Sequence, residues 1–335
     1  MSATSKTDPP WLSVLLPVHD VGPLLDDCVA SVLDQGVDGI ELVFVDDASR
    51  GDDAARLAGW AQRRPEAIRV VTHERNRGVA AARNTLLANA RGEYVWFVDP
   101  DDLVEPGALG ALRTLLAGNR PDLVLCDFRT FRDGATLRPH VGTFEGPHGT
   151  FSDDRDALLA GLFRTGQLHP WTKIVRRAAW PESVRFPEGR VFEDLALYPR
   201  LALAMRSFVH VPQVWVAYRQ REGSILAALS EKKLDDWTQA LVGYPVELRD
   251  AGIALAEDTR FEIAHFSART LQRAVRRWRE LCTHAYAGER LQAFGARWRA
   301  SSPLTADELA RAYLKRWRIG RWIQFLWTMR VIGRD

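Results

Sequence analysis

The chain has 335 residues, of which 46% are hydrophobic and 26% are charged, and its formal net charge at pH 7 is +2. This length exceeds the usual size of a single domain, roughly 100–200 residues, and therefore predicts one large domain with an appended region. The composition is ordinary for a globular protein, and the near-zero net charge excludes a chain-wide polyelectrolyte.

The cysteines and the first residues bear on the cellular compartment. Cys28, Cys126 and Cys282 lie far apart without a Cys-x-x-Cys pair, which argues against a structural zinc site or a disulfide framework. Residues 1–10 are polar and lack the apolar core of a signal peptide, and no run approaches the ~20 apolar residues of a spanning helix. These features predict a cytoplasmic protein.

The first part of the chain predicts a βαβ unit. An apolar strand at 12–17 is followed by a helix that begins near Pro23, and a second apolar strand at 40–45 ends in Asp46-Asp47. Strand, helix and strand at this spacing predict a right-handed crossover and a parallel sheet.

The pattern repeats with helices at 54–64 and 78–90 and strands at 68–72 and 94–98. The last strand runs into Asp99-Pro100-Asp101-Asp102. Because carboxyl ends of parallel strands meet at one edge of a sheet, these acids and the Asp46-Asp47 pair are expected to face one crevice. Asp99 and Asp101 can project toward one hard cation such as Mg²⁺. The alternative interpretation is a set of solvated Asp-rich turns.

Phosphate-binding glycine motifs are absent from the sequence. No Gly-x-Gly-x-x-Gly follows a strand and no Walker-type motif is present, so a nucleotide would be held without those loops. Arg83, in the 78–90 helix, can reach a phosphate, although an exposed helix arginine is the simpler interpretation.

Four motifs in order resemble the family 2 glycosyltransferases of the GT-A fold, over roughly residues 11–225; they are Ser13–Val18, Val45–Ser49, Asn76–Asn84 and Phe97–Asp102. The resemblance implies an α/β fold of the Rossmann-like nucleotide-diphospho-sugar transferase type, with a mostly parallel sheet flanked by helices. It also implies a nucleotide-sugar donor, a Mn²⁺ or Mg²⁺ ion, and inversion at the anomeric carbon.

The same resemblance implies roles for single residues on the donor side. By position, the residues implied to bind the donor are Pro17, Val18, His19, Asp20, Asp46, Asp47, Arg83 and Asp99. Within this set, Asp46 and Asp47 match acids that contact base and ribose, and Arg83 matches a basic residue near the diphosphate. Asp99 and Asp101 match the Asp-x-Asp metal motif, with Asp101 as the direct ligand. His19-Asp20 stand where the family usually has Tyr-Asn.

The next segment predicts the acceptor side. A strand is expected at 121–128, and Ser152 is expected to cap a helix at 153–163. Residues 171–175 and 186–194 resemble acceptor-side segments of bacterial polysaccharide and teichoic-acid members of the family.

From this resemblance, Trp171 and Lys173 are implied to bind the acceptor or the diphosphate. Glu193 and Asp194 are implied to open a helix as the catalytic acids, with Asp194 as the base that takes the proton of the attacking hydroxyl. The alternative is that both acids only complement a helix dipole.

A strand at 214–218 leads into a basic segment. Arg219 and Arg221 match a Tyr-Arg-x-Arg-x-Gly-Ser segment of the same subgroup and are candidates to close over a diphosphate or an anionic acceptor. A solvated basic loop explains the segment equally well.

From Glu231 onward, helical patterns dominate, with expected breaks at Gly243, Gly252, Gly288, Gly295 and Ser301-Ser302-Pro303. We therefore expect a catalytic domain at 11–228, divided into donor (11–105) and acceptor (106–228) halves, and a helical region at 229–335. Arg and Trp cluster at 273–279 and 315–322, which fits an anchor on an anionic membrane surface. A plain helical cap or a homo-oligomerisation module fits as well, whereas no nucleic-acid module is present.

Together these features predict a metal-dependent inverting glycosyltransferase that acts on a cell-envelope glycan, teichoic-acid or lipid-linked acceptor, with a UDP-sugar favoured as donor. A non-catalytic sugar-nucleotide or glycan-binding protein on the same fold is the alternative, followed by a nucleotidyltransferase.

Overall fold

A computed structural model describes residues 9–132, 140–220, 230–281 and 287–333. In this part of the chain, nine strands form one mixed sheet in the order β3-β2-β1-β4-β8-β6-β9-β5, with β7 paired to β6. The first four strands are parallel and alternate with helices as predicted; they are β1 (Leu12–Val18), β2 (Ile40–Asp46), β3 (Ile68–Thr72) and β4 (Tyr94–Phe97).

Register aligns the carboxyl ends of these strands. Val18 of β1 pairs with Asp46 of β2, and Leu15 of β1 pairs with Phe97 of β4, so the loops after β1, β2 and β4 leave the sheet at one edge. This is the edge at which open α/β sheets bind ligands.

Helices cover both faces of the sheet because side chains alternate along each strand. Val14 and Leu16 of β1 pack in one core with α1 (Leu24–Leu33), α2 (Asp53–Arg63) and α4 (Ala108–Gly118). Leu15 packs in the other core with α3 (Val79–Asn89), α5 (Arg155–Thr165) and α6 (Glu193–Ala204).

The second half of the sheet is mixed. It contains β5 (Leu103–Val104), β6 (Leu123–Phe131), β7 (His140–Val141), β8 (Lys173–Arg176) and β9 (Phe208–Arg219), with short 3-10 helices η1 (Pro170–Thr172) and η2 (Arg177–Ala179) around β8. The predicted cap of α5 was wrong: the side chain of Asp154, not Ser152, accepts from the backbone N–H of Ala157 at 3.0 Å. Ser152 instead forms an isolated bridge with Phe208.

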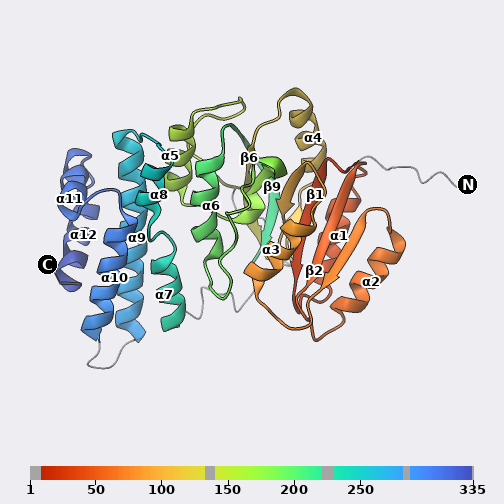
Figure 1. Cartoon of the computed structure of the whole chain (residues 1–335), viewed down its shortest axis with the longest axis horizontal. Helices are drawn as coiled ribbons and strands as arrows, with labels where there is room; N and C mark the ends of the chain where they lie inside the picture. The colour runs from red at the N-terminus through yellow and green to blue at the C-terminus, as the bar shows by residue number, and fades with distance from the viewer. Residues whose placement is uncertain (1–8, 133–139, 221–229, 282–286, 334–335) are drawn as a thin grey trace, which may run out of the picture.

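The C-terminal region is helical, as expected, and has a hydrophobic core of its own. Figure 1 shows it at the end of the molecule opposite α2; the helices are α7 (Glu231–Gln239), α8 (Tyr244–Asp250), α9 (Glu257–Leu281), α10 (Ala287–Ser301), α11 (Ala306–Lys315) and α12 (Ile319–Val331). The expected break at Gly295 was wrong, because α10 runs through it, whereas Gly288 is the second residue of α10. Gly295 allows close packing instead, since a Cβ there would lie 2.9 Å from Cδ1 of Ile332.

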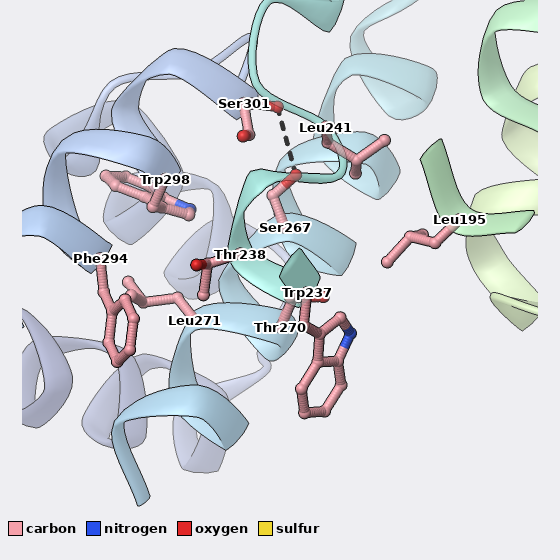
Figure 2. Close-up of a pocket in the computed structure, with 10 residues that line it drawn as sticks. All are labelled: Leu195, Trp237, Thr238, Leu241, Ser267, Thr270, Leu271, Phe294, Trp298 and Ser301. Carbon is pink, nitrogen blue, oxygen red and sulfur yellow. Dashed lines mark hydrogen bonds between the residues drawn. The ribbon is translucent and has the colours of Figure 1, made fainter. Parts of the chain in front are cut away.

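The helical region packs directly on the sheet-flanking helix α6. Figure 2 shows a pocket of about 20 Å³ between α7, α9 and α10 that Leu195 of α6 also lines. Ser267 donates to the carbonyl of Ser301 at 3.2 Å beside this pocket. Within the described residues, none of the helices is both long and apolar enough to span a membrane.

Candidate active site

Two acids, the buried Asp53 and the exposed Asp20, hold the loops at the carboxyl edge of the sheet. Asp53, at the start of α2, accepts hydrogen bonds from the backbone N–H groups of Val21 and Gly22 at 2.8 and 2.7 Å. Asp20 accepts from the backbone N–H of Arg50 at 2.7 Å, and this bond lowers the pKa of the Asp20 carboxyl. The loops after β1 and β2 therefore support each other.

Asp47 organises the loop that leads into α3. Its Oδ1 accepts from Nδ1 of His73 at 2.6 Å and from the backbone N–H of Arg77 at 2.9 Å, and its Oδ2 accepts from the N–H of Gly78 at 2.8 Å. Gly78 has φ of +87°, a conformation that a residue with a side chain rarely adopts. With three donors on its two oxygens, Asp47 is a rigid part of this edge.

Four more residues predicted to bind the donor lie along the same edge. Nε2 of His19 lies 2.8 Å from Nδ2 of Asn76, so the loops after β1 and β3 meet at this contact. The side chain of Asp46 accepts from the N–H of Ser49 at 2.9 Å. Pro17 and Val18 are the last two residues of β1 and pair with β2. The fold therefore places these predicted donor-side residues together at the carboxyl edge of the sheet.

Arg83 of α3 links the turn after β4 to the start of α6. Its Nη1 donates to Oε1 of Glu193 at 2.5 Å and its Nη2 donates to Oδ1 of Asp99 at 3.1 Å, while the residue is only 4% exposed. Burial opposes the charge, but Asp99 and Glu193 outweigh it and raise the pKa of the guanidinium above its usual range. The prediction that Arg83 lies near a donor phosphate remains a prediction; its geometry makes it a bridge between carboxylates.

Hydrogen bonds between Asp102, Asp101 and Arg219 hold the turn after β4 in place. Asp102 is fully buried and accepts from the backbone N–H of Arg219 at 2.8 Å, and Nε of Arg219 donates to the carbonyl of Asp101 at 2.9 Å. Arg219 also reaches Asp27 of α1 at 3.3 Å. Arg219, predicted to bind the acceptor or diphosphate, thus holds the Asp99–Asp102 turn, while Arg221 lies outside the described residues.

The chemistry of this turn fits a hard divalent cation. Asp99 and Asp101 supply carboxylate oxygens, and the side chain of Asp99 is 24% exposed although it contacts Arg83. In the described parts of the chain, no group of three or more His, Cys, Asp or Glu side chains gathers at metal-binding geometry. Mg²⁺ is typically held by one or two protein carboxylates together with substrate phosphates, so a pair of acids at this edge is the expected donor set.

Glu193 and Asp194 open α6, as predicted. Burial raises the pKa of Glu193 despite the Arg83 charge. Burial also acts to raise the pKa of Asp194, but His169 and then Arg83 more than offset this, so it lies below its ordinary value of 3.8. Nδ1 of His169 lies 3.7 Å from Oδ2 of Asp194, an ion-pair distance longer than a hydrogen bond. Asp194 is thus the acid held in its ionised form.

Aromatic rings form one wall beside Asp194. The ring of His169 stacks on Trp171 at 4.4 Å between centroids, and Trp171 stacks on Tyr218 at 5.2 Å with an interplanar angle of 1°. Flat aromatic surfaces of this kind suit the apolar faces of sugar rings.

Lys173 lies beneath this wall and is 1% exposed. Its Nζ donates to the carbonyls of Gln167 and His169 at 2.9 Å each and to Oγ1 of Thr172 at 3.0 Å. Burial lowers the pKa of Lys173 to about 7, although the Asp194 charge opposes this. Lys173 therefore positions His169 through its backbone, whereas Trp171 lies in the wall itself.

Sequence reasoning missed the supporting residues of this site. Asp53 and His169 had the clearest signals: an acid at the start of a helix and an imidazole in the run His169-Pro170-Trp171. Asn84 was named only as the end of the third motif, yet its side chain donates to the carbonyl of Phe186 at 2.9 Å and accepts from the N–H of Phe186 at 2.9 Å. Asn84 thereby holds the segment that precedes Glu193.

Residues 13–182, half of the chain, match the family model described as glycosyl transferase family 2. The chain belongs to this family. The resemblance to family 2 that the four motifs indicated is confirmed.

Curated relatives include bacterial glycosyltransferases and a teichoic acid biosynthesis protein. Glycosyltransferase GlyA of Streptococcus pneumoniae is 27% identical over 70% of this chain, and the minor teichoic acid biosynthesis protein GgaB of Bacillus subtilis is 25% identical over 71%. The chain spans only 36% of GlyA and 26% of GgaB.

The fold is also similar to a solved structure. The crystal structure of S. aureus TarS residues 1–349 in complex with UDP-GlcNAc has a TM-score of 0.69 with 19% sequence identity, covering 93% of this chain and 89% of that one. The predicted GT-A-type fold with a C-terminal helical region is confirmed by this likeness and by the family match.

Proposed function

We propose that this enzyme transfers a sugar with inversion from a nucleotide-diphosphate donor, with a UDP-sugar favoured, to a hydroxyl group of a cell-envelope glycan, teichoic-acid or lipid-linked acceptor. The observation that carries the proposal is the bridge from Arg83 to both Asp99 and Glu193, because it joins the acids after β4 to the acids that open α6. Binding of UDP-GlcNAc by TarS supports a UDP-sugar, and the relative GgaB supports an envelope acceptor.

In this proposal Asp194 is the base. Its carboxylate takes the proton of the acceptor hydroxyl as that oxygen forms a bond to the anomeric carbon, and the bond from that carbon to the donor phosphate breaks on the opposite face. The lowered pKa of Asp194 keeps it ionised before the reaction, and His169 orients it. Glu193 and Arg83 keep the start of α6 in place.

The donor would lie at the edge formed by the loops after β1, β2 and β4. Asp46, His19 and Asp20 would face the base and ribose there, and Asp47 would hold the loop that carries Arg77 and Gly78. Asp101, with Asp99, would hold a Mn²⁺ or Mg²⁺ ion. When bound, such an ion supplies Lewis-acid neutralisation of the departing diphosphate.

The acceptor would lie against the aromatic wall on the side of Asp194. The ring of Trp171 is in stacking contact with His169 and Tyr218, and Lys173 holds the backbone below. Arg219 would act through the turn that it fixes, and Arg221 is proposed from its position in the sequence alone.

We also propose that residues 11–228 act as the catalytic unit and that the helical region from 229 contacts an anionic membrane surface. Tyr313 and Phe325 are buried in the core of this region itself. Trp317 of the same region is 86% exposed, which supports a contact outside the chain.

The metal and donor assignments can be tested by calorimetry with UDP in the presence and absence of Mn²⁺. Asp101→Asn should abolish the metal-dependent part of UDP binding, because it removes a negative charge from the ion's ligand. Glu105→Gln, which lies outside the crevice in an ion pair with Arg129 at 2.5 Å, serves as a control and should bind UDP like the wild type. Unchanged Mn²⁺ dependence in Asp101→Asn would contradict the metal assignment.

A further inference from the structure

A row of arginines on α9 faces α12. Arg269, Arg273 and Arg276 recur at three- and four-residue spacing, which places them on one side of the helix. Together with neighbours from both helices they line a pocket of about 240 Å³, whose residues are Arg269, Gln272, Arg273, Arg276, Arg321 and Gln324. None of these residues belongs to the proposed active site.

The positive charge of this pocket is not neutralised by acids of the chain. Other arginines nearby have acidic partners, as Arg277 has in Glu280 at 2.6 Å and Arg318 in Glu262 at 3.6 Å. Across residues 9–132, 140–220, 230–281 and 287–333, none of the four pocket arginines forms an ion pair. Four guanidinium groups therefore share one small concavity.

The positive charges of these arginines contribute to lowered pKa values of Arg269 and His265. Burial, followed by the charges of Arg273 and Arg321, lowers the pKa of the Arg269 guanidinium. Burial, followed by the charges of Arg318 and Arg269, lowers the pKa of His265 to about 3. His265 thus stays neutral, with its Nδ1 2.8 Å from the hydroxyl of Tyr313, and adds no charge.

Gln272 points independently to a ligand. Its residue is 6% exposed and lines the pocket, yet its Nε2 has no hydrogen-bond acceptor among the described residues. A buried amide donor without a partner is energetically unfavourable. A rotation of the Gln272 side chain into the pocket would let an oxygen of a bound anion accept this hydrogen bond while the arginines pair with its charge.

Exposed apolar side chains lie beside the pocket on α12. Ile323 is 57% exposed and Trp327, four residues later on the same side of the helix, is 46% exposed. The guanidinium of Arg279 of α9 lies 5.3 Å from the Trp327 ring, so the arginine row of α9 continues up to this aromatic side chain. Trp and Arg side by side are typical of a surface that meets lipid headgroups.

We propose that the pocket between α9 and α12 binds the phosphate of an anionic phospholipid headgroup, with Ile323 and Trp327 entering the interface beside it. Charge complementarity and the adjacent apolar side chains favour a lipid over a soluble phosphate. This inference deepens the proposed membrane contact and rests on it for the source of the phosphate. Figure 1 shows α12 at the end of the molecule opposite α2, so this surface is separate from the donor-side loops.

Sedimentation with vesicles tests the inference on the full-length enzyme. The pocket variant is Arg273→Gln with Arg276→Gln, and the control is Arg113→Gln with Arg249→Gln; all four side chains are exposed and both variants lose two charges. At about 0.1 M salt, wild type and control should bind vesicles of phosphatidylglycerol with phosphatidylcholine, and the pocket variant should bind on the order of 10-fold or more weakly. Ile323→Ser with Trp327→Ser should also weaken binding.

Several results would overturn the inference. Equal weakening of vesicle binding in the pocket and control variants would mean that binding depends only on the net charge of the protein. Stabilisation of the wild type by millimolar glycerol 3-phosphate, but not of the pocket variant, without vesicle binding would assign the pocket to a soluble phosphate. A change in oligomeric mass by light scattering, with no vesicle binding, would assign the surface to self-assembly. UDP calorimetry on the same samples separates these outcomes from a failure of the glycosyltransferase proposal, which predicts equal UDP affinity in all variants.

Discussion

Arg83 donates to Glu193 at 2.5 Å across 110 residues of sequence, and this ion pair is almost fully buried. Arg83 comes from α3, behind the donor-side loops, whereas Glu193 is the first residue of α6. Because Arg83 also reaches Asp99, one guanidinium fixes the distance between the metal-type acids and the acids at the start of α6.

Removing Arg83 should destabilise the enzyme as well as inactivate it. Arg83→Met leaves Glu193 buried without its partner, and loss of one member of a buried pair typically costs about 3–5 kcal/mol. Urea unfolding should show this loss. Arg120→Met, which breaks an ion pair with Glu93 at 2.7 Å that is largely exposed, should cost less than about 1 kcal/mol.

A double variant separates the ion pair from packing. Arg83→Met combined with Glu193→Gln should recover part of the stability, because the remaining carboxyl charge is gone. Strictly additive losses would show that the two side chains do not act on each other.

His169 should set the acid limb of the pH profile. The base form of Asp194 is present above its pKa, and that pKa lies below its ordinary value, so wild-type kcat/KM should hold to lower pH than an unperturbed aspartate would allow. His169→Phe keeps a ring that can stack on Trp171 but removes the imidazole beside Asp194, so burial should raise the pKa of Asp194 and move the acid limb to higher pH. His169→Asn, which keeps a donor, should move it less. Parallel profiles in all three proteins would mean that His169 does not act on the base.

Trp237 should affect catalysis from outside the crevice. Phe192, directly before Glu193, has φ of +61°, a conformation unusual for a residue with a side chain, and its ring stacks on Trp237 of α7 at 5.2 Å. Trp237→Leu releases this stack, so kcat should fall by between about 10-fold and 10²-fold through misplacement of Asp194. UDP affinity should stay within a few-fold.

Trp298→Leu provides the matched control for Trp237→Leu. Trp298 is buried in the same helical region and lines the pocket in Figure 2, but its ring contacts Phe325 instead of Phe192. It should lower stability without a specific loss in kcat. Equal kcat losses in both variants would contradict a positioning role for Trp237.

The periodicity of the sequence predicted the first half of the fold well. Apolar runs located β1, β2 and β4, and those of β2 and β4 end in acids, because buried parallel strands are apolar throughout and their loops gather polar residues. The cap of α5 was misassigned because Ser152 and Asp154 are both good caps and only tertiary pairing of Ser152 with Phe208 separates them. Gly295 was taken as a break because its close packing on Ile332 is not visible in the sequence.

The candidate site was predicted as a set of residues but not as a network. Motifs located Arg83, Lys173 and Arg219, and all three are nearly buried and hold other groups in place. Sequence spacing gives no sign of burial for a long cationic side chain, so a bridging arginine and a ligand-binding arginine look alike. Contacts between residues more than 100 positions apart, such as that of Arg83 with Glu193, can be identified only from the folded structure.

The central claim is that Asp194 is the base and that the acids after β4 bind the donor separately from it. The most direct test is to measure UDP affinity and single-turnover sugar transfer of Asp194→Asn side by side, once a donor and acceptor pair is found. The account predicts UDP affinity within a few-fold of wild type and a transfer rate lower by on the order of 10²–10⁴-fold. Equal losses of UDP affinity and of transfer rate, or a transfer rate near that of wild type, would contradict it.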